Sequence, residues 1–539
     1  MHLDFLGKRV FIFLAVLILI SAILRFYKLP QRQYWMIDEE RDAFIVKRIL
    51  VDKHPTLIGG ALPGGFYLAP GYFYISAFFY YFTNLNPIGM GAIAAFLGVL
   101  STPLIFYVAK KLFSPRVGIL AAFFYTFSYL TVIYNRTWWP LTFSPIVALV
   151  CYWSLYQIIK SKNLGFVLVL ALALIIGIQS DPSNLSLLVL TIILWIIFKL
   201  PIRVKPVILA VGLFIISHLP LVIFDFRHDF LNSKAILKFF SGQTGAGINF
   251  DSGTFLESLL LLPRSFLRFL WVFGEKDVAV QIVPSEVYVQ AKFSAIPWAF
   301  LISVMVILAL FFIRLIKEKK KNLGIFILGS HMLVAIFGII LQNFFFGNWN
   351  FEWVMQVLFP AYAIVFALFV NHLFKYNRLH LPVIGTISSL YLALVLFAIF
   401  SAKTIIQSPN SFNLYDKMRA VEFIVEKTGQ DQFSLDSIGQ NFALGGYRYL
   451  FYLQGKEPVR SYMDYIYADW LYPKKDLWQD HPQTVAVIVN KETCIANVCP
   501  THPDFEYKYQ QYLAKTKEKT QFGHIQVLIV DNSQHWVKW

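Results

Sequence analysis

Long apolar runs alternate with short polar segments over the first four hundred residues of the chain. A helix needs about 20 apolar residues to cross ~30 Å of hydrocarbon. Runs of that kind predict eleven membrane-spanning helices, at residues 10–26, 88–109, 117–134, 142–160, 164–180, 184–199, 207–224, 293–314, 323–345, 353–374 and 381–401. After these runs the pattern changes. The stretch "DKMRAVEFIVEK" indicates an amphipathic helix, and "TVAVIVN" and "IQVLIVD" indicate buried strands.

The basic residues between the runs predict the orientation of the chain. If the eleven runs are the crossings, all of the basic clusters fall on one side of the membrane, which the positive-inside rule makes the cytoplasmic side. The clusters are Lys8 and Arg9; Lys110, Lys111 and Arg116; Lys160 and Lys162; Lys199, Arg203 and Lys205; Arg314 with "KEKKK" at 317–321; and Lys375 and Arg378. The first run lacks a small-x-small cleavage site, so it is interpreted as an uncleaved span with a cytoplasmic N-terminus.

One ambiguous segment, residues 64–82, resembles a further span. Counting it as a crossing would move the cluster around Lys110 to the outer side. The segment is rich in Tyr and Phe and is interrupted by Pro70 and Gly71, as is typical of a segment at the headgroup level. Residues 27–87 are therefore predicted to form one large outer loop with interfacial helices.

Two domains follow from this pattern: a transmembrane domain at residues 1–404 and a small extracytoplasmic α/β domain at residues 405–539. A second large outer loop is predicted at residues 225–292. Composition agrees, because 57% of the residues are hydrophobic and the mean hydropathy is +0.59, which excludes an ordinary water-soluble globule. The basic residues behind the net charge of +16 lie in loop clusters, so the charge is attributed to the cytoplasmic loops of a membrane protein. No nucleic-acid partner is expected.

Three consecutive acids open the first outer loop, in the stretch "YWMIDEERDAF" at residues 34–44. One interpretation is structural: Asp38 caps an interfacial helix, while Glu39 and Glu40 occupy its first turn, where the helix dipole favours acids. The other is chemical, with Asp38 as a general base at the membrane face. The two interpretations are compatible, since a capping carboxylate can also accept a proton.

Several cations are predicted on the same outer side. Arg227 and His228 follow the seventh run, and Arg136 stands in "NRTWWPLTF" after the third run. One interpretation is that these cations only anchor the chain at the membrane surface. However, cations on the outer side run against the positive-inside bias, so the alternative is that they bind an anionic partner such as a lipid phosphate. Asp181 in "QSDPSN" fits a turn, and His218 lies within a span, where it is either functional or simply hydrogen-bonded.

Other chemistry finds little support. Cys494 and Cys499 could form a disulfide in an oxidising exterior, but with His502 they lack an evident fourth zinc ligand. No Gly-rich nucleotide-binding loop is present where it should be. Chemistry that needs no nucleotide therefore fits the outer face.

The pattern resembles the GT-C superfamily of glycosyltransferases, in particular the branch of the protein O-mannosyltransferases and aminoarabinose transferases. The resemblance rests on the large first outer loop that opens with "DEER" at residues 38–41, on the Pro/aromatic stretch at residues 70–74 and on "NRTWWPLTF". It covers roughly the first 230 residues, and the later spans match only in style. It implies a polytopic α-helical membrane protein that uses a polyprenyl-phosphate-linked monosaccharide as donor.

The resemblance also implies roles for residues. Asp38 takes the place of the catalytic carboxylate with Glu39 as its neighbour, and Arg41 contacts the phosphate or orders the loop. The acceptor hydroxyl would lie on a protein, a glycolipid or a polysaccharide, and transfer would invert the sugar in a single displacement.

Two departures limit this carry-over. The stretch 69–71 lacks the Lys that the branch often has there, so phosphate binding is assigned to Arg227, His228 or Arg136. Many members of the branch also carry an acid in the outer loop that corresponds to "NRTWWPLTF", and this stretch contains none, so no essential metal and no further cofactor are expected. The main alternative function is a polytopic transporter or lipid flippase, which should show midplane acids or a repeat between halves. A non-catalytic scaffold that presents the C-terminal domain is a third possibility.

Overall fold

The computed structural model describes residues 2–62, 64–202, 204–241, 252–271, 298–346, 352–380, 383–407, 413–439, 445–464, 482–490 and 505–534. Within these ranges, eight helices are long and apolar enough to cross a membrane. Three shorter apolar helices, Pro115–Phe127, Phe166–Ser180 and Pro182–Ile197, coincide with the three remaining predicted runs. The chain is an integral membrane protein, as the apolar pattern predicts.

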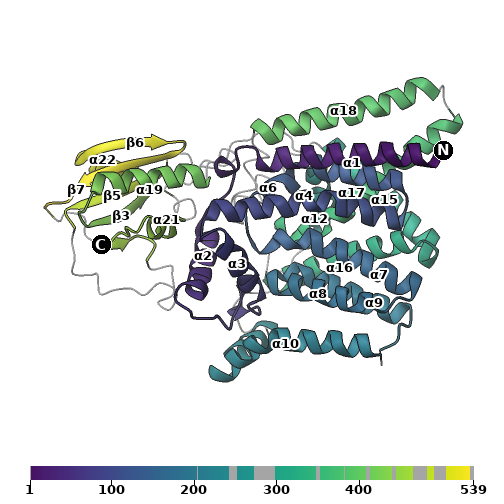
Figure 1. Cartoon of the computed structure of the whole chain (residues 1–539), viewed down its shortest axis with the longest axis horizontal. Coiled ribbons are helices and arrows are strands. Elements are labelled where there is room, and N and C mark those ends of the chain that lie inside the picture. The colour runs from purple at the N-terminus through teal and green to yellow at the C-terminus, as the bar shows by residue number, and fades with distance from the viewer. Residues whose placement is uncertain are drawn as a thin grey trace.

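The membrane bundle is built from helices that run back and forth between two faces (Figure 1). They are α1 (His2–Phe26), α4 (Pro87–Leu112), α5 (Pro115–Phe127), α6 (Tyr129–Tyr134), α7 (Ser144–Ser161), α8 (Phe166–Ser180), α9 (Leu185–Ile197), α10 (Lys205–Arg227), α12 (Ser252–Leu270), α15 (Trp298–Glu318), α16 (Leu323–Phe346), α17 (Phe359–His380) and α18 (Val383–Gln407). Short 3-10 turns precede several of them: η1 (Leu29–Gln31), η2 (Pro140–Phe143), η3 (Pro182–Asn184), η5 (Lys319–Lys321) and η6 (Glu352–Leu358).

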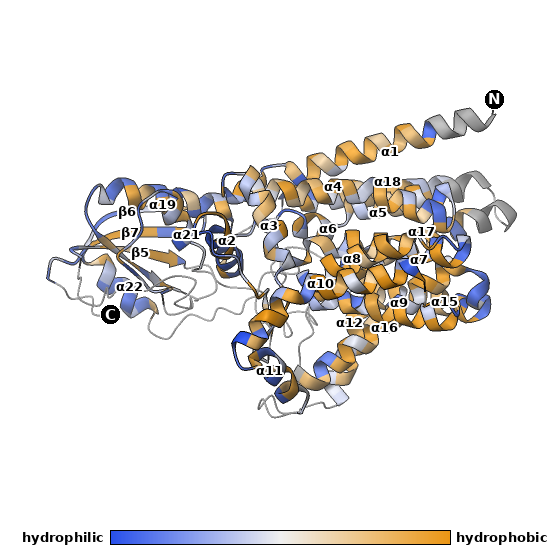
Figure 2. Cartoon of the chain, turned by 60° about the horizontal axis from the view of Figure 1, so that its bottom comes forward, coloured by the Kyte–Doolittle hydropathy of each residue, from blue (hydrophilic) through white to orange (hydrophobic). Residues whose placement is uncertain are grey.

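Burial separates central from peripheral helices. The span that ends in α17 and the span that ends in α7 are mostly buried, whereas α10 lies at the edge of the bundle and is largely exposed. Its exposed residues include Ile208, Val211 and Ile215. Figure 2 shows the apolar colour covering the length of the bundle, with polar residues at its ends. An apolar surface of this extent requires lipid around it.

The third predicted run is one span broken in two. The backbone leaves the helical conformation at Ser128, between α5 and α6, and the Ser128 side chain accepts a hydrogen bond from the backbone N–H of Thr131. The Thr131 hydroxyl donates to the carbonyl of Tyr125 at 2.7 Å. This side-chain bond satisfies a backbone acceptor that the break would otherwise leave without a partner inside the bundle.

The first loop carries α2 (Ile37–Leu50), the hairpin β1 (Ala61–Leu62) and β2 (Phe66–Tyr67), and α3 (Gly71–Phe82). With 12 residues, α3 is too short to span a bilayer at a rise of about 1.5 Å per residue. Both helices lie between the bundle and the sheet, at the end that we name the domain face (Figure 1). The predicted second outer loop contains α11 (Leu231–Phe240) and also α12, which packs against α16 and α15.

The C-terminal domain is a mixed five-stranded sheet with helices on both sides. Its strands β3 (Phe433–Ile438), β4 (Arg460–Ser461), β5 (Thr484–Asn490), β6 (Thr516–Phe522) and β7 (Ile525–Asp531) lie in the order β4-β3-β5-β7-β6. Strands β3, β4 and β5 are parallel, and β7 is antiparallel to both of its neighbours. The predicted strands at 484–490 and 525–531 are therefore confirmed, as is the α/β class of the domain.

Alternation along β5 explains how the sheet is covered. Val485, Val487 and Val489 share a core with α22 (Phe505–Leu513), whereas Ala486 and Ile488 share a core with α19 (Leu414–Thr428). Successive side chains of a strand point to opposite faces, so each face needs its own helix. A further short helix, α21 (Arg448–Leu453), joins the α19 side.

Candidate active site

The N-terminus of α2 presents one exposed carboxylate beside a fixed cation. Asp38 Oδ1 accepts a hydrogen bond from Arg41 Nη1 at 2.8 Å, and 63% of the Asp38 side chain is exposed. Arg41 is held from its other side by Asp42, whose Oδ1 accepts from Nη2 at 2.8 Å and from Nε at 3.1 Å. Asp42 is only 9% exposed, so Arg41 is anchored and Asp38 remains accessible.

Glu39, not Asp38, completes the start of the helix. Helix α2 begins at Ile37 with Met36 as its N-cap, and Glu39 Oε2 accepts from the Met36 backbone N–H at 3.0 Å. The interpretation of Asp38 as the capping residue is wrong, because the structure places it inside the first turn, beyond the cap. Burial, followed by the negative charge of Asp38, raises the pKa of Glu39 to about 7. Asp38 is thus free of capping and has a neighbour that titrates near neutrality.

Glu40, the third acid, is fully buried and faces the C-terminal domain. Its Oε1 accepts from the Tyr449 backbone N–H at 2.7 Å, and its Oε2 accepts from the Gly446 backbone N–H at 3.1 Å. The sequence showed three similar acids in a row, but the structure gives them three different environments. Only their partners distinguish them, and those of Glu40 lie about four hundred residues away in the chain.

Arg136 lies between α6 and η2. It is buried, and its Nη2 donates to the Leu24 carbonyl at 2.5 Å. Its Nε has no hydrogen-bond partner among the described residues. The next residue, Thr137, accepts a hydrogen bond from the backbone N–H of Tyr34 at 3.0 Å, which ties this loop to the chain just before Asp38.

Two further arginines act on Arg136. Burial, followed by the charge of Arg32, lowers the pKa of Arg136, and Arg25 adds a smaller effect in the same direction. Arg25, at the end of α1, is fully buried and binds neutral groups. Its Nη1 donates to the Ser21 hydroxyl at 2.8 Å, and its Nε donates to the side-chain Oδ1 of Asn135 at 3.2 Å. Burial of several cations near one another is costly unless an anion joins them. This corner is therefore suited to bind an anion.

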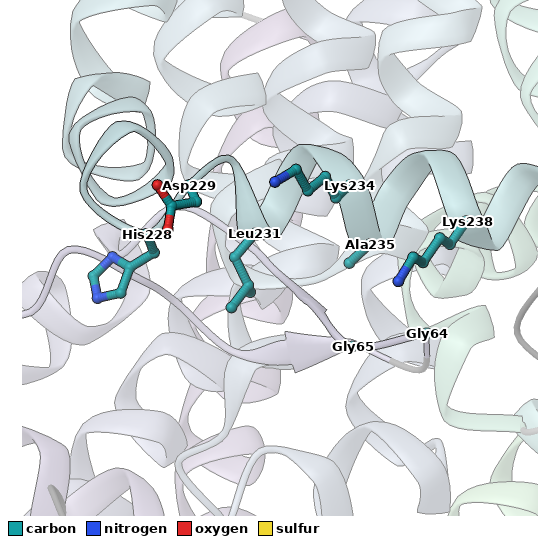
Figure 3. A pocket seen from close by; sticks show the side chains of 8 residues that line it. All are labelled: Gly64, Gly65, His228, Asp229, Leu231, Lys234, Ala235 and Lys238. Carbon is teal, nitrogen blue, oxygen red and sulfur yellow. The ribbon is translucent and has the colours of Figure 1, made fainter.

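Arg227 and His228 lie elsewhere on the domain face. Both are exposed, at the end of α10, and His228 stacks on Phe224. His228 lines an open cavity of about 380 Å³ between α11 and the β1–β2 turn (Figure 3). The cavity is also lined by Gly64, Gly65, Asp229, Leu231, Lys234, Ala235 and Lys238. Neither Asp38 nor Arg41 lines this cavity.

The remaining candidates have ordinary structural partners. Asp181 Oδ1 accepts from the Ser183 backbone N–H at 2.8 Å, as expected for a turn acid. His218 hydrogen-bonds to the Phe214 carbonyl at 2.9 Å through Nδ1 and stacks on that ring. Cys494, Cys499 and His502 lie outside the described residues. Within the described ranges, no group of three or more His, Cys, Asp or Glu side chains is placed to hold a metal ion.

A buried ion pair at this face was missed by sequence reasoning. Arg268 of α12 and Glu352 of η6 approach to 3.1 Å, both almost fully buried, and their charges act on Tyr134 at the end of α6. A recognisable signal was present, because charged residues inside an apolar helix are rare and often functional. Arg264 and Arg268 stand four residues apart in the apolar stretch "LLLLPRSFLRFL". In the sequence-based prediction, this stretch belongs to the second large outer loop, at residues 225–292.

The described chain combines a bundle of apolar helices with a helical first loop and a C-terminal sheet domain on the same face. The structure is similar to that of ArnT, the aminoarabinose transferase, from Cupriavidus metallidurans in the apo state, with a TM-score of 0.55 and 10% sequence identity over 97% of this chain and 98% of that one. The resemblance to the GT-C superfamily is confirmed at the level of the fold.

Two further solved structures are less similar. One is the same ArnT bound to undecaprenyl phosphate, with a TM-score of 0.49 and 12% identity over 97% of this chain and 98% of that one. The other is the oligosaccharyltransferase AglB from Archaeoglobus fulgidus with an inhibitory peptide and a dolichol-phosphate, with a TM-score of 0.46 and 14% identity over 99% and 75%. The fold assignment rests on the first similarity. No protein-family model and no curated protein matches the sequence.

Proposed function

We propose that this protein is a membrane glycosyltransferase that moves a monosaccharide from a polyprenyl-phosphate donor to an acceptor hydroxyl at the domain face. The observation that carries the proposal is the N-terminus of α2, where an accessible Asp38 is fixed by Arg41 next to Glu39. The GT-C fold supports the class of reaction, although a fold alone does not define a substrate.

In this reaction the acceptor oxygen attacks the anomeric carbon while the bond from that carbon to the phosphate oxygen breaks. Asp38 takes the proton of the attacking hydroxyl, and polyprenyl phosphate leaves with the electron pair of the broken bond. The phosphate is already a good leaving group, so the protein must supply a positioned base and cations near the departing oxygen. A single displacement of this kind inverts the anomeric configuration.

We assign the donor phosphate to the corner that holds Arg136, and we propose that Arg41, beside Asp38, contacts it or orders the loop. Arg136 Nε has no hydrogen-bond partner among the described residues, and a phosphate oxygen would supply one. Arg227 and His228, which the sequence also suggested, are exposed and lie beside the α11 cavity. We propose that they make at most a minor contribution to donor binding, and the variants in the Discussion test this division.

We further propose that the N-terminus is cytoplasmic and that the domain face and C-terminal domain are extracytoplasmic. Lys110 and Lys111 lie in the last turn of α4, which begins near the domain face and ends at the opposite end of the bundle. Basic residues that gather at that opposite end support a cytoplasmic assignment for it. A cysteine-accessibility map that labels position 111 from outside would contradict the assignment.

The test is a donor panel. Membranes that contain the protein receive radiolabelled polyprenyl-phosphate sugars, and the release of polyprenyl phosphate is followed together with the appearance of label in protein, glycolipid and polysaccharide. A transferase consumes at least one donor and forms a new glycoside. A transporter or flippase would move the donor across the bilayer and leave its sugar–phosphate bond intact, and that outcome would reject the proposal.

The reaction is proposed to need no divalent metal. Treatment with EDTA followed by removal of the chelator should leave the transfer rate unchanged. Loss of activity that Mg²⁺, Mn²⁺ or Ca²⁺ restores would show that a metal acts at the site.

A further inference from the structure

The C-terminal domain contacts the first loop through residues that flank Asp38. Glu40 accepts hydrogen bonds from the backbone N–H groups of Gly446 and Tyr449. In return, Lys417 of α19 donates to the carbonyls of Trp35 at 2.7 Å and Gly445 at 2.5 Å. Two charged side chains, one from each side, thus bridge the same junction. We name these contacts the latch.

Trp35 adds a third connection. Its Nε1 donates to the Gly446 carbonyl at 2.7 Å, so both backbone polar groups of Gly446 are bound by the first loop. Gly446 has a φ of +94°, and a Cβ atom there would lie 2.8 Å from the Trp35 ring. Both facts demand glycine at this position. A side chain at residue 446 would therefore disturb the latch.

The hydrophobic core also crosses the junction. Phe44 of α2 meets Tyr449 edge-to-face with ring centroids 5.3 Å apart, and Trp35 lies 5.8 Å from the same ring. One continuous cluster of buried side chains includes residues of α2, α3, α19, α21 and the sheet. A soluble domain that was only tethered would keep a core of its own, so the two parts are built as a single packed unit.

The charges make this junction specific. Glu40 is 0% and Lys417 is 1% exposed. If the domain moved away without water reaching them, each would become a buried charge without a partner, which is strongly unfavourable. The position of the α2 N-terminus and the position of the domain are therefore coupled.

We propose that Glu40 and Lys417 are positioning residues through which the C-terminal domain holds Asp38 and Glu39 in their catalytic geometry. The proposal rests on the proposed function, since it concerns the carboxylates that this function uses. Neither residue touches the reacting atoms. They act by fixing the backbone on both sides of Asp38, where a displacement of about 1 Å is enough to slow a positioned reaction roughly a hundredfold.

Lys417 also acts on the charge of Glu39. The ionisable groups that interact with Glu39 come from three helices: Asp38 and Asp42 on α2, the neutral Tyr72 and Tyr80 on α3, and Lys417 on α19. Lys417 is the cation in this group that comes from the C-terminal domain. Removal of its charge favours the protonated form of Glu39, so the pKa of Glu39 rises. A purely structural residue would not move that titration.

The kinetic test compares Lys417→Met with Lys417→Arg, in membranes supplied with whichever donor the wild type consumes. Lys417→Met is expected to lower kcat about 10-fold, to change KM for the donor less than about 2-fold, and to move the acidic limb of the rate profile upward by roughly half a pH unit to one unit. Lys417→Arg keeps the charge and should keep the limb within about 0.2 pH units of the wild type. Arg419→Met removes a charge from the exposed side of the same helix and should change neither quantity.

A second test needs no activity. A Cβ on residue 445 would lie 2.9 Å from Ile37 Cβ, within a small backbone shift of the ~3.8 Å spacing of a disulfide, so the pair Ile37→Cys with Gly445→Cys should cross-link on mild oxidation. The pair Lys53→Cys with Gly445→Cys is the control, because Lys53 lies beyond the far end of α2. The oxidised 37–445 double variant should retain at least about half of its transfer rate, because the bond fixes the contact that catalysis uses.

Each outcome decides the proposal. Failure of the 37–445 pair to cross-link overturns the latch itself. A wild type that transfers sugar, with Lys417→Met unchanged in kcat and in its pH profile, overturns the positioning role and leaves the proposed function in place. A wild type that transfers no sugar from any donor overturns the proposed function, and the positioning role falls with it.

Discussion

Two regions of the domain face gather positive charge, and they are built differently. In the first region, Arg41 of α2 is anchored by Asp42. Arg136, whose neighbour Thr137 accepts a hydrogen bond from Tyr34, is buried. At the α11 cavity, His228, Lys234 and Lys238 are side chains that follow one another along a single stretch of chain, at the rim of an open space. The first region holds its charges in fixed positions, whereas the second offers them to solvent.

This difference separates a site that is preorganised for chemistry from one that is not. Catalysis benefits from groups that need no reorganisation at the moment of reaction, and burial strengthens each electrostatic interaction. Exposed lysines lose conformational freedom when they bind and are screened by salt. We therefore expect the two regions to respond very differently to substitution.

The largest effect is expected at Asp38. Asp38→Asn removes the proton acceptor and keeps the size of the side chain, so kcat should fall by roughly 10²- to 10⁴-fold. Asp52→Asn is the matched control, because Asp52 lies just past the other end of α2, where it pairs with Lys47. Initial rates with the active donor measure both. Equal rates for the two variants would remove Asp38 from the mechanism.

A smaller loss is expected at Arg136. Arg136→Met removes a buried charge from the corner assigned to the donor phosphate, and kcat/KM should fall roughly 10- to 100-fold, as is usual for a lost hydrogen bond to a charged group. The comparison is with Arg227→Met, an exposed cation of the other region. A greater loss for Arg227→Met would place the phosphate at the end of α10.

The pH profile of the wild type follows from Glu39. Its pKa of about 7 means that Glu39 is mostly protonated below pH 7 and ionised above it. The proposal makes the ionised form of Glu39 the active one, so kcat/KM should rise with pH through an apparent pKa near 7. Glu39→Gln should abolish this limb. A wild-type profile that stays flat from about pH 5.5 to about pH 8.5 would contradict the role of Glu39.

The smallest effect is expected at the α11 cavity. The triple variant His228→Gln, Lys234→Gln, Lys238→Gln should change kcat/KM less than about 3-fold at physiological salt, because exposed charges contribute on the order of 1 kcal/mol or less and are screened. Rates at low and high salt provide the measurement. A loss comparable with that of Arg136→Met would show that the two regions share the donor.

The sequence predicted elements well where one local pattern determined them. The length of the apolar runs located the spans, and two short apolar runs placed β5 and β7 at their observed bounds. The acids at 38–40 and the cation at 136 were singled out from their position in the chain, and their roles stay predictions. Local pattern could not separate Asp38 from Glu40, because Glu40 is distinguished only by backbone N–H groups of Gly446 and Tyr449.

Other features escaped for the same reason. In the sequence, Arg25 is a single charge at the end of the first span. In the structure it is buried in the bundle, where it donates hydrogen bonds to Asn135 and Thr131, which lie far along the chain. In the sequence, Lys417 is one of several polar residues of an amphipathic helix. In the structure its ammonium group lies in the junction with the first loop. Long-range contacts of this kind require the fold before they can be seen.

The configuration of the transferred anomeric carbon tests the central claim most directly. NMR of the product made by the wild type from its active donor reports that configuration. Asp38 acting as a base in a single displacement predicts inversion relative to the donor. Retention would mean two displacements through a covalent sugar–enzyme intermediate, and it would contradict the account of Asp38 as the base.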